Sequence, residues 1–198
     1  QFNTNREIDS AALAADVLRY RSFLRGGGLT LSGGEPLAQP AFAADVIRRV
    51  KAEGLHAAID TSGAIAVSHC REAVDLADLI LLDIKHIDPD KSLEITGQDN
   101  SNAIRLLEYC EQTEKPVWVR HVVVPGLTDD WDALERLAAF LAGFQCIERI
   151  EILPFHKMGE YKWQELGLPY RLGDVEPPAP ERIDRIRALF VRHGLKAA

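Results

Sequence analysis

Residues 79–86 read Leu-Ile-Leu-Leu-Asp-Ile-Lys-His, an apolar run that passes directly into charged residues. A short run that is apolar on both faces is typical of a strand buried on both sides, as in a parallel sheet covered by helices. Comparable runs occur at 29–31, 56–59, 117–124 and 150–153. The pattern predicts an α/β fold in which five parallel strands with right-handed connections form a curved sheet or a partial TIM-like (β/α) barrel.

Helical spacing of apolar residues separates these strands. It predicts helices at 10–24, 42–54, 70–77, 102–110, 131–141 and 180–193. Ser10 is expected to cap the first of them, and Val46, Ile47 and Val50 are expected to share one face of the second. Since neither a repeat nor a low-complexity linker divides the chain, we expect residues 1–198 to form a single domain.

Composition excludes several classes of function. The 198 residues are 46% hydrophobic, and a formal net charge of -7 argues against a nucleic-acid partner, which would favour a basic face. Apolar runs fall short of the roughly 20 residues that cross a bilayer. The chain begins with Gln1 rather than a start Met and shows no signal-peptide pattern. We expect a cytoplasmic protein.

The cysteines do not form a ligand motif. Cys70, Cys110 and Cys146 lie far apart in the sequence, whereas metal and cluster ligands usually lie two to four residues apart. An odd number of cysteines also argues against a disulfide framework. We expect three reduced, buried thiols.

Polar residues follow four of the predicted strands. In parallel α/β folds ligands bind beyond the carboxyl ends of the strands, so these residues are candidates for a site. The four strand ends are Ser32-Gly33-Gly34-Glu35-Pro36, Asp60-Thr61-Ser62-Gly63, Asp83-Ile84-Lys85-His86 and Pro154-Phe155-His156. Polar residues at a single strand end commonly serve only to form a turn. Four ends on one rim indicate a site that carries both signs of charge.

Residue types suggest what this site binds. Gly33 and Gly34 allow a ligand to approach the backbone, and Glu35 suits an ammonium group. Side chains alternate along a strand, so Asp83 and Lys85 point the same way, and Lys85 could hold a carboxylate. Asp60 and Asp83 could share a cation. The set suits a zwitterionic amino acid, while the alternative is an internal Asp–Lys ion pair that only closes the barrel end.

These strand ends lie within longer blocks that resemble one known family. The segment 29–36, Leu-Thr-Leu-Ser-Gly-Gly-Glu-Pro, resembles the Gly-Gly-Glu motif of radical S-adenosylmethionine (SAM) enzymes. Blocks at 60–63, 82–85, 119–126, 151–156 and 161–163 are similar to those of the enzymes that activate pyruvate formate-lyase. The similarity runs in order from about Ile8 to the end of the chain, which makes it far more specific than Gly-Gly-Glu alone.

The resemblance implies roles for individual residues. Gly33, Gly34 and Glu35 would meet the amino group of SAM, while Asp83, Ile84, Lys85 and His156 would line the same ligand. Asp60, Thr61 and Asp83 would form a monovalent-cation site. Arg120 would have a supporting role near the site, and Ser62 stands where many relatives have Asn.

The resemblance also implies the reaction and its partners. A [4Fe–4S] cluster, reduced by flavodoxin or ferredoxin, would cleave SAM to a 5′-deoxyadenosyl radical. That radical would abstract hydrogen from a glycine of pyruvate formate-lyase (formate C-acetyltransferase), an enzyme of anaerobic metabolism. The protein would position the cofactor and exclude water.

The sequence departs from the family in one important respect. The three-cysteine cluster motif of the family is not present between Gln1 and Ala198 and would lie upstream of Gln1, with the first βα unit of the barrel. Residues 1–198 by themselves are therefore expected to be inactive. Two alternatives remain open: an activator of another glycyl-radical enzyme, and a non-catalytic (β/α) binding module that has lost the cluster. A barrel hydrolase lacks support, because no nucleophile–base arrangement is recognisable.

Overall fold

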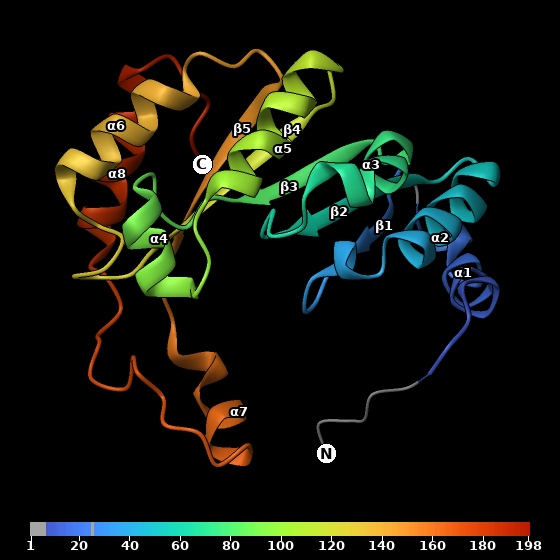
Figure 1. The fold of residues 1–198 in the computed structure, drawn as a ribbon, viewed down its shortest axis with the longest axis horizontal. Helices are drawn as coiled ribbons and strands as arrows, with labels where there is room; N and C mark the ends of the chain where they lie inside the picture. Colours follow the sequence, from blue (N-terminus) through green and yellow to red (C-terminus); the bar gives the residue numbers. More distant parts are fainter. Residues whose placement is uncertain (1–6, 25) are drawn as a thin grey trace. The chain divides into compact units, whose positions relative to one another are not determined.

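The protein is described by a computed structural model covering residues 7–24 and 26–198 (Figure 1). Its contacts divide it into two compact units. The first unit comprises the described residues up to Asp83 together with Asn102–Val117, and the second comprises Ile84–Ser101 and Trp118–Ala198. The single-domain expectation stays a prediction, and each unit is described by itself.

Three parallel strands form the sheet of the first unit. They are β1 (Gly28–Leu31), β2 (His56–Thr61) and β3 (Leu79–Asp83). Leu31 pairs with Ile59, and Ile59 pairs with Ile80. The five strands of the chain follow the order β1-β2-β3-β4-β5, so neighbours in the sheet are also neighbours in the sequence. This order is what helical crossovers between successive parallel strands produce, and it confirms the predicted α/β architecture.

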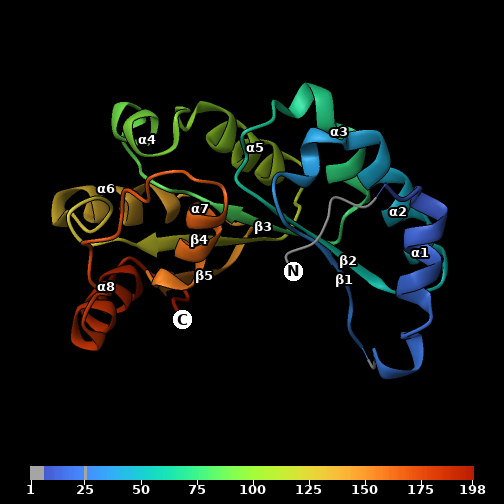
Figure 2. The ribbon, with the colours of Figure 1, turned by 90° about the horizontal axis from the view of Figure 1, so that it is seen from below.

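Helices precede, join or follow the strands of the first unit. They are α1 (Ser10–Leu18), α2 (Pro40–Ala52), α3 (Val67–Leu76) and α5 (Ser101–Gln112). Helix α2 packs between α1 and α3 (Figure 2). Its residues Val46, Ile47 and Val50 are completely buried, as their spacing predicts. The unit therefore has an apolar core of its own.

The start and end of α1 differ from the prediction. The cap is Asp9, whose side chain accepts a hydrogen bond from the Ala12 N–H, while the Ser10 hydroxyl donates to Asp45 at 2.5 Å. A carboxylate one residue earlier thus satisfies one of the free N–H groups of the first turn. The helix ends at Leu18, and Leu24 lies beyond it, after a 3₁₀ turn at Arg21–Phe23.

The second unit contains the remaining strands and helices. They are β4 (Val117–Val123, whose first residue belongs to the first unit), β5 (Ile147–Pro154), α4 (Pro89–Thr96), α6 (Trp131–Leu141), α7 (Glu160–Glu165) and α8 (Pro180–Arg192). Helices α4 and α7 were missing from the sequence prediction. Asp88 caps α4 by accepting from the Asp90 and Lys91 N–H groups, and Pro89 occupies its first turn. An acidic cap followed by proline is a helix-start pattern that could have been recognised.

Contacts between residues that are far apart in the sequence hold the second unit together. Arg182 of α8 lies 3.0 Å from an Asp129 carboxylate oxygen and also donates to the Asp129 carbonyl, which fixes the loop before α6. Residues 196–198 run parallel to β5, where the Ile152 N–H donates to the Ala198 carbonyl at 3.0 Å. One edge of β5 is therefore covered by the last residues of the sequence.

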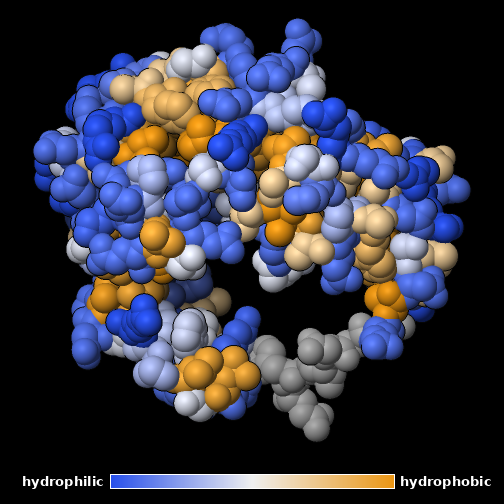
Figure 3. Space-filling view, in the orientation of Figure 1, coloured by the Kyte–Doolittle hydropathy of each residue, from blue (hydrophilic) through white to orange (hydrophobic). Residues whose placement is uncertain are grey.

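Exposed apolar side chains gather around α7. Met158 is 75% exposed, Leu166 72% and Trp163 41%. In Figure 3 an orange patch lies where Figure 1 places α7. Among the described residues, the search for a helix that is long and apolar enough to cross a membrane finds none.

Candidate functional site

A glycine turn follows β1. Gly33 and Gly34 both have positive φ, 86° and 55°, which side chains other than glycine rarely adopt. A methyl group built on either residue would meet no atom within 4 Å. The space beside this backbone is therefore open, and the predicted role of the two glycines in ligand binding stays a prediction.

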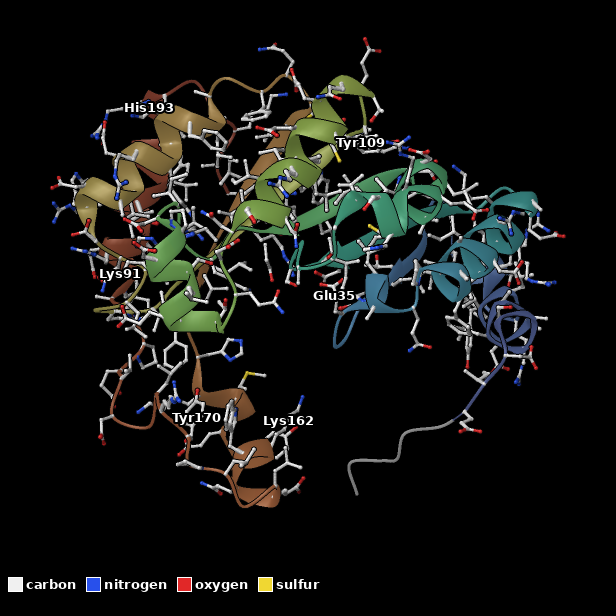
Figure 4. The ribbon with its side chains drawn as sticks, viewed as in Figure 1. Glu35, Lys91, Tyr109, Lys162, Tyr170 and His193 are labelled. Carbon is white, nitrogen blue, oxygen red and sulfur yellow. The ribbon has the colours of Figure 1, made fainter. Side chains whose placement is uncertain are left out.

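The Glu35 carboxylate is held by the end of β2 (Figure 4). Oε1 accepts from the Thr61 hydroxyl at 2.7 Å and from the Leu37 N–H at 3.1 Å. Oε2 accepts from the Ser62 hydroxyl at 2.5 Å and from the Ser62 N–H at 3.0 Å. Glu35 thus connects the turn after β1 with residues 61–62. Sequence analysis did not assign a role to Ser62, although two adjacent hydroxyl residues at a strand end could have suggested one.

The expected cation ligands of the first unit lie on two strands. Asp60 accepts a hydrogen bond from the Ser32 hydroxyl at 2.8 Å. Thr61 is 2% exposed, and its hydroxyl oxygen also accepts from the Gly63 N–H at 3.0 Å. Asp83 ends β3 and is half-buried. Their oxygen atoms are the type of ligand that a hard cation prefers. The assignment of a shared cation to these three residues stays a prediction.

The predicted alternation of buried and partly exposed side chains is visible at residues 84–86 of the second unit. Ile84 and His86 are buried, whereas Lys85 between them is partly exposed. The Ile84 N–H donates to the Arg120 carbonyl at 3.0 Å, as parallel-strand pairing requires. His86 Nδ1 accepts from the Asp88 N–H at 3.0 Å. Lys85 therefore lies on the opposite side of the extended segment after β3 from the buried side chains of Ile84 and His86.

A buried histidine supports this layer. His121 is 2% exposed, with Nδ1 2.9 Å from the Ile84 carbonyl oxygen and Nε2 3.0 Å from the Thr128 carbonyl oxygen. Burial lowers the pKa of His121 below its ordinary value of 6.5, although the two carbonyls oppose that shift. The ring joins the segment before Lys85 to the turn after β4, a role that sequence analysis missed.

His156 and Arg120 occupy the positions that the strands predict. His156 follows β5, is exposed, and is the N-cap residue of the 3₁₀ turn that begins at Lys157, although its side chain does not make a capping hydrogen bond. Arg120 is partly exposed within β4, whose alternate residues are buried. Their assignments to the cofactor stay predictions.

The cysteines are buried and free, as expected. Burial, followed by the Glu35 charge, raises the pKa of Cys70 to about 11, and burial raises the pKa of Cys110 to about 12. Protonated thiols are poor metal ligands. Within residues 7–24 and 26–198, groups of three His, Cys, Asp or Glu side chains that could hold a metal ion are absent. The described residues therefore do not provide a ligand set for an iron–sulfur cluster.

Comparisons with known proteins identify the class. Residues 1–138 match the model of the Radical SAM superfamily. Streptococcus suis SuiB bound to S-adenosylmethionine has the same fold, with a TM-score of 0.74 over 100% of this chain and 45% of that chain at 15% identity. The chain is thus a member of the radical SAM superfamily.

The family within this superfamily follows from more similar proteins. The curated pyruvate formate-lyase-activating enzyme of Staphylococcus epidermidis (strain ATCC 12228 / FDA PCI 1200) is 40% identical over 187 residues, which are 90% of this chain and 74% of that protein. A domain of pyruvate-formate lyase-activating enzyme from Bacteroides vulgatus ATCC 8482 superposes with a TM-score of 0.73 at 25% identity, over 87% of this chain and 98% of that one. The chain belongs to the family of pyruvate formate-lyase-activating enzymes.

Proposed function

We propose that this chain provides the SAM-binding region of an enzyme that generates the glycyl radical of pyruvate formate-lyase. The observation that carries the proposal is the 40% identity over 187 residues to curated enzymes of that name. The radical SAM family implies two cofactors, SAM and a [4Fe–4S] cluster. When bound, they supply one-electron cleavage of the sulfonium and hydrogen abstraction.

The residues of this chain hold and orient the cofactor. In the first unit, the open turn at Gly33 and Gly34 would receive the amino group, with the negative charge of Glu35 behind it. Asp60, Thr61 and Asp83 would hold a monovalent cation. In the second unit, Lys85 would hold the carboxylate of SAM, and Ile84 and His156 would line the cofactor.

The partner is a protein, and the surface offers apolar area for one. The exposed side chains around α7 support a docking surface for the glycyl-radical enzyme, because contiguous exposed apolar groups commonly mark protein interfaces. Flavodoxin or ferredoxin would supply the electron. A cytoplasmic location suits these partners.

A direct assay tests the function. The full-length protein would be reduced without oxygen in the presence of SAM and pyruvate formate-lyase. We expect a glycyl radical on the lyase by electron paramagnetic resonance, together with 5′-deoxyadenosine and methionine. Radical formation only on a different glycyl-radical enzyme would change the partner. SAM binding without cleavage by protein that carries an intact, reducible cluster would contradict an activating enzyme.

A further inference from the structure

We infer that Ser62 and Glu35 form a positioning pair, in which Glu35 acts on the cofactor site by fixing the ends of two strands rather than by contacting the ammonium group. The inference rests on the proposed function and refines the expected role of Glu35. Ser62 has no role in the sequence-based assignments.

The Glu35 carboxylate already accepts as many hydrogen bonds as it can hold. An ionised carboxylate has about four acceptor positions. Four hydrogen bonds of 2.5–3.1 Å fill them in this structure, two on each oxygen. An ammonium group would have to displace one of these donors, and two of them are backbone N–H groups that cannot turn away. The charge of Glu35 still attracts a cation at longer range.

The donors of these hydrogen bonds come from two separate segments of the chain. Leu37 belongs to the turn after β1, whereas Thr61 and Ser62 belong to the end of β2. Glu35 therefore holds together the turn with the open backbone at Gly33–Gly34 and the strand end with the expected cation ligands. Ser62 binds with both its N–H and its hydroxyl to a single oxygen, so it fixes that end of the carboxylate.

The position of Ser62 makes it a useful probe. Ser62 is exposed, so its hydroxyl can be removed without disturbing the apolar core. Ser62→Ala leaves the carboxylate and its charge in place. A direct ammonium contact by Glu35 would therefore be unaffected by Ser62→Ala, whereas a positioning role would be weakened, because one of the four bonds that fix the carboxylate is lost.

Glu35→Gln complements this variant. The amide retains one oxygen and replaces the other with an NH₂ group. In either orientation the NH₂ group faces a backbone N–H, that of Leu37 or that of Ser62. Glu35→Gln should thus break the same link that Ser62→Ala weakens, and the two changes should not be additive.

The experiment is a SAM titration of the full-length, cluster-containing enzyme, with Ser68→Ala on the exposed face of α3 as the matched control. Ser62→Ala should raise Kd about threefold to tenfold, the range of a typical single hydrogen bond, because Ser62 acts on SAM only through Glu35 and its N–H bond to Glu35 remains. Ser62→Thr, which keeps the hydroxyl, should stay within about twofold of wild type, and Ser62→Ala should have little further effect in the Glu35→Gln background.

Two results would overturn the inference: wild-type affinity for Ser62→Ala, or effects of Ser62→Ala and Glu35→Gln that multiply. These outcomes differ from a failure of the proposed function, in which the wild-type protein itself would not bind SAM. The iron content and the urea unfolding midpoint of each variant establish that the protein titrated is folded and loaded.

Discussion

Gly63, just beyond β2, lies so close to α5 that a methyl group on its Cα would stand 2.7 Å from the Cα of Ala103. Its φ is also positive, at 68°. The end of β2 and the beginning of α5 therefore approach each other at a distance that only glycine allows, directly beside Thr61 and Ser62.

Replacing Gly63 should thus destabilise the protein for two reasons. A positive φ costs alanine about 1–2 kcal/mol, and overpacking adds roughly 1–3 kcal/mol. Gly54→Ala is the matched control, because Gly54 has a φ of 75° and open space beside it. Urea unfolding should show a larger loss for Gly63→Ala than for Gly54→Ala. Equal losses would mean that the contact with Ala103 is relieved without cost.

Lys85→Ala should weaken SAM binding at least about tenfold, because a charge-assisted contact with the carboxylate typically contributes 1.5–3 kcal/mol. Lys91→Ala is the control, since Lys91 is exposed on α4 and paired with Glu94 at 2.7 Å. A titration of the full-length protein measures both variants. Unchanged affinity for Lys85→Ala would remove this residue from the site.

Cation identity should change SAM affinity if Asp60, Thr61 and Asp83 hold a monovalent ion. Binding of the ion and of SAM would then be linked reciprocally, with a coupling of about 1–3 kcal/mol. SAM is titrated in sodium, potassium or a bulky organic cation at constant ionic strength. Asp60→Asn should abolish the difference between the ions. Indifference of the wild-type protein to the cation would contradict the shared site.

The unfolding free energy should fall in acid because His121 is buried. Since burial lowers its pKa below 6.5, the unfolded chain takes up a proton at a higher pH than the folded chain. The stabilisation is complete above about pH 6.5 and decreases as the pH falls towards the folded pKa. Denaturation of wild type and His121→Gln across this range should show a weaker pH dependence for the variant. His69→Gln, at an exposed position on α3, should keep the wild-type dependence.

Replacing Cys70, Cys110 and Cys146 with alanine in the full-length protein should leave iron content and SAM cleavage largely intact. All three are buried thiols, and the high pKa of Cys70 and Cys110 keeps these two protonated. A lower unfolding midpoint is expected because small apolar contacts are lost. Loss of the cluster from folded protein would show that one of them is a ligand.

The regular spacing of apolar residues made most of the helices and strands predictable. The helix expected at 131–141 matches α6 residue for residue, and the apolar run at 79–82 lies within β3. Helix α4 escaped prediction because only one of its residues, Ser92, is buried, so its sequence has no regular apolar face. Helix α1 began at a different cap because Asp9 and Ser10 are both good capping residues, and the contact of Ser10 with Asp45 is invisible in a linear pattern.

The candidate site was predictable only in part. Strand ends could be located from apolar runs, and so the glycine turn, Asp60 and Lys85 could be selected. The four hydrogen bonds to Glu35 depend on which strands are neighbours, and Ser62 is 27 residues away from Glu35 in the sequence. The two carbonyl contacts of His121 likewise join three separate segments.

The pairing of residues 196–198 with β5 has a consequence for the folding of the second unit. Until these residues dock, the edge of β5 that they cover presents backbone groups without these partners, namely the N–H and carbonyl of Ile150 and the N–H of Ile152. Such an edge can pair with another chain, so the nascent second unit passes through an aggregation-prone stage. Docking of residues 196–198 ends this exposure, so the backbone at this edge of β5 is satisfied only when the last contacts of the second unit form.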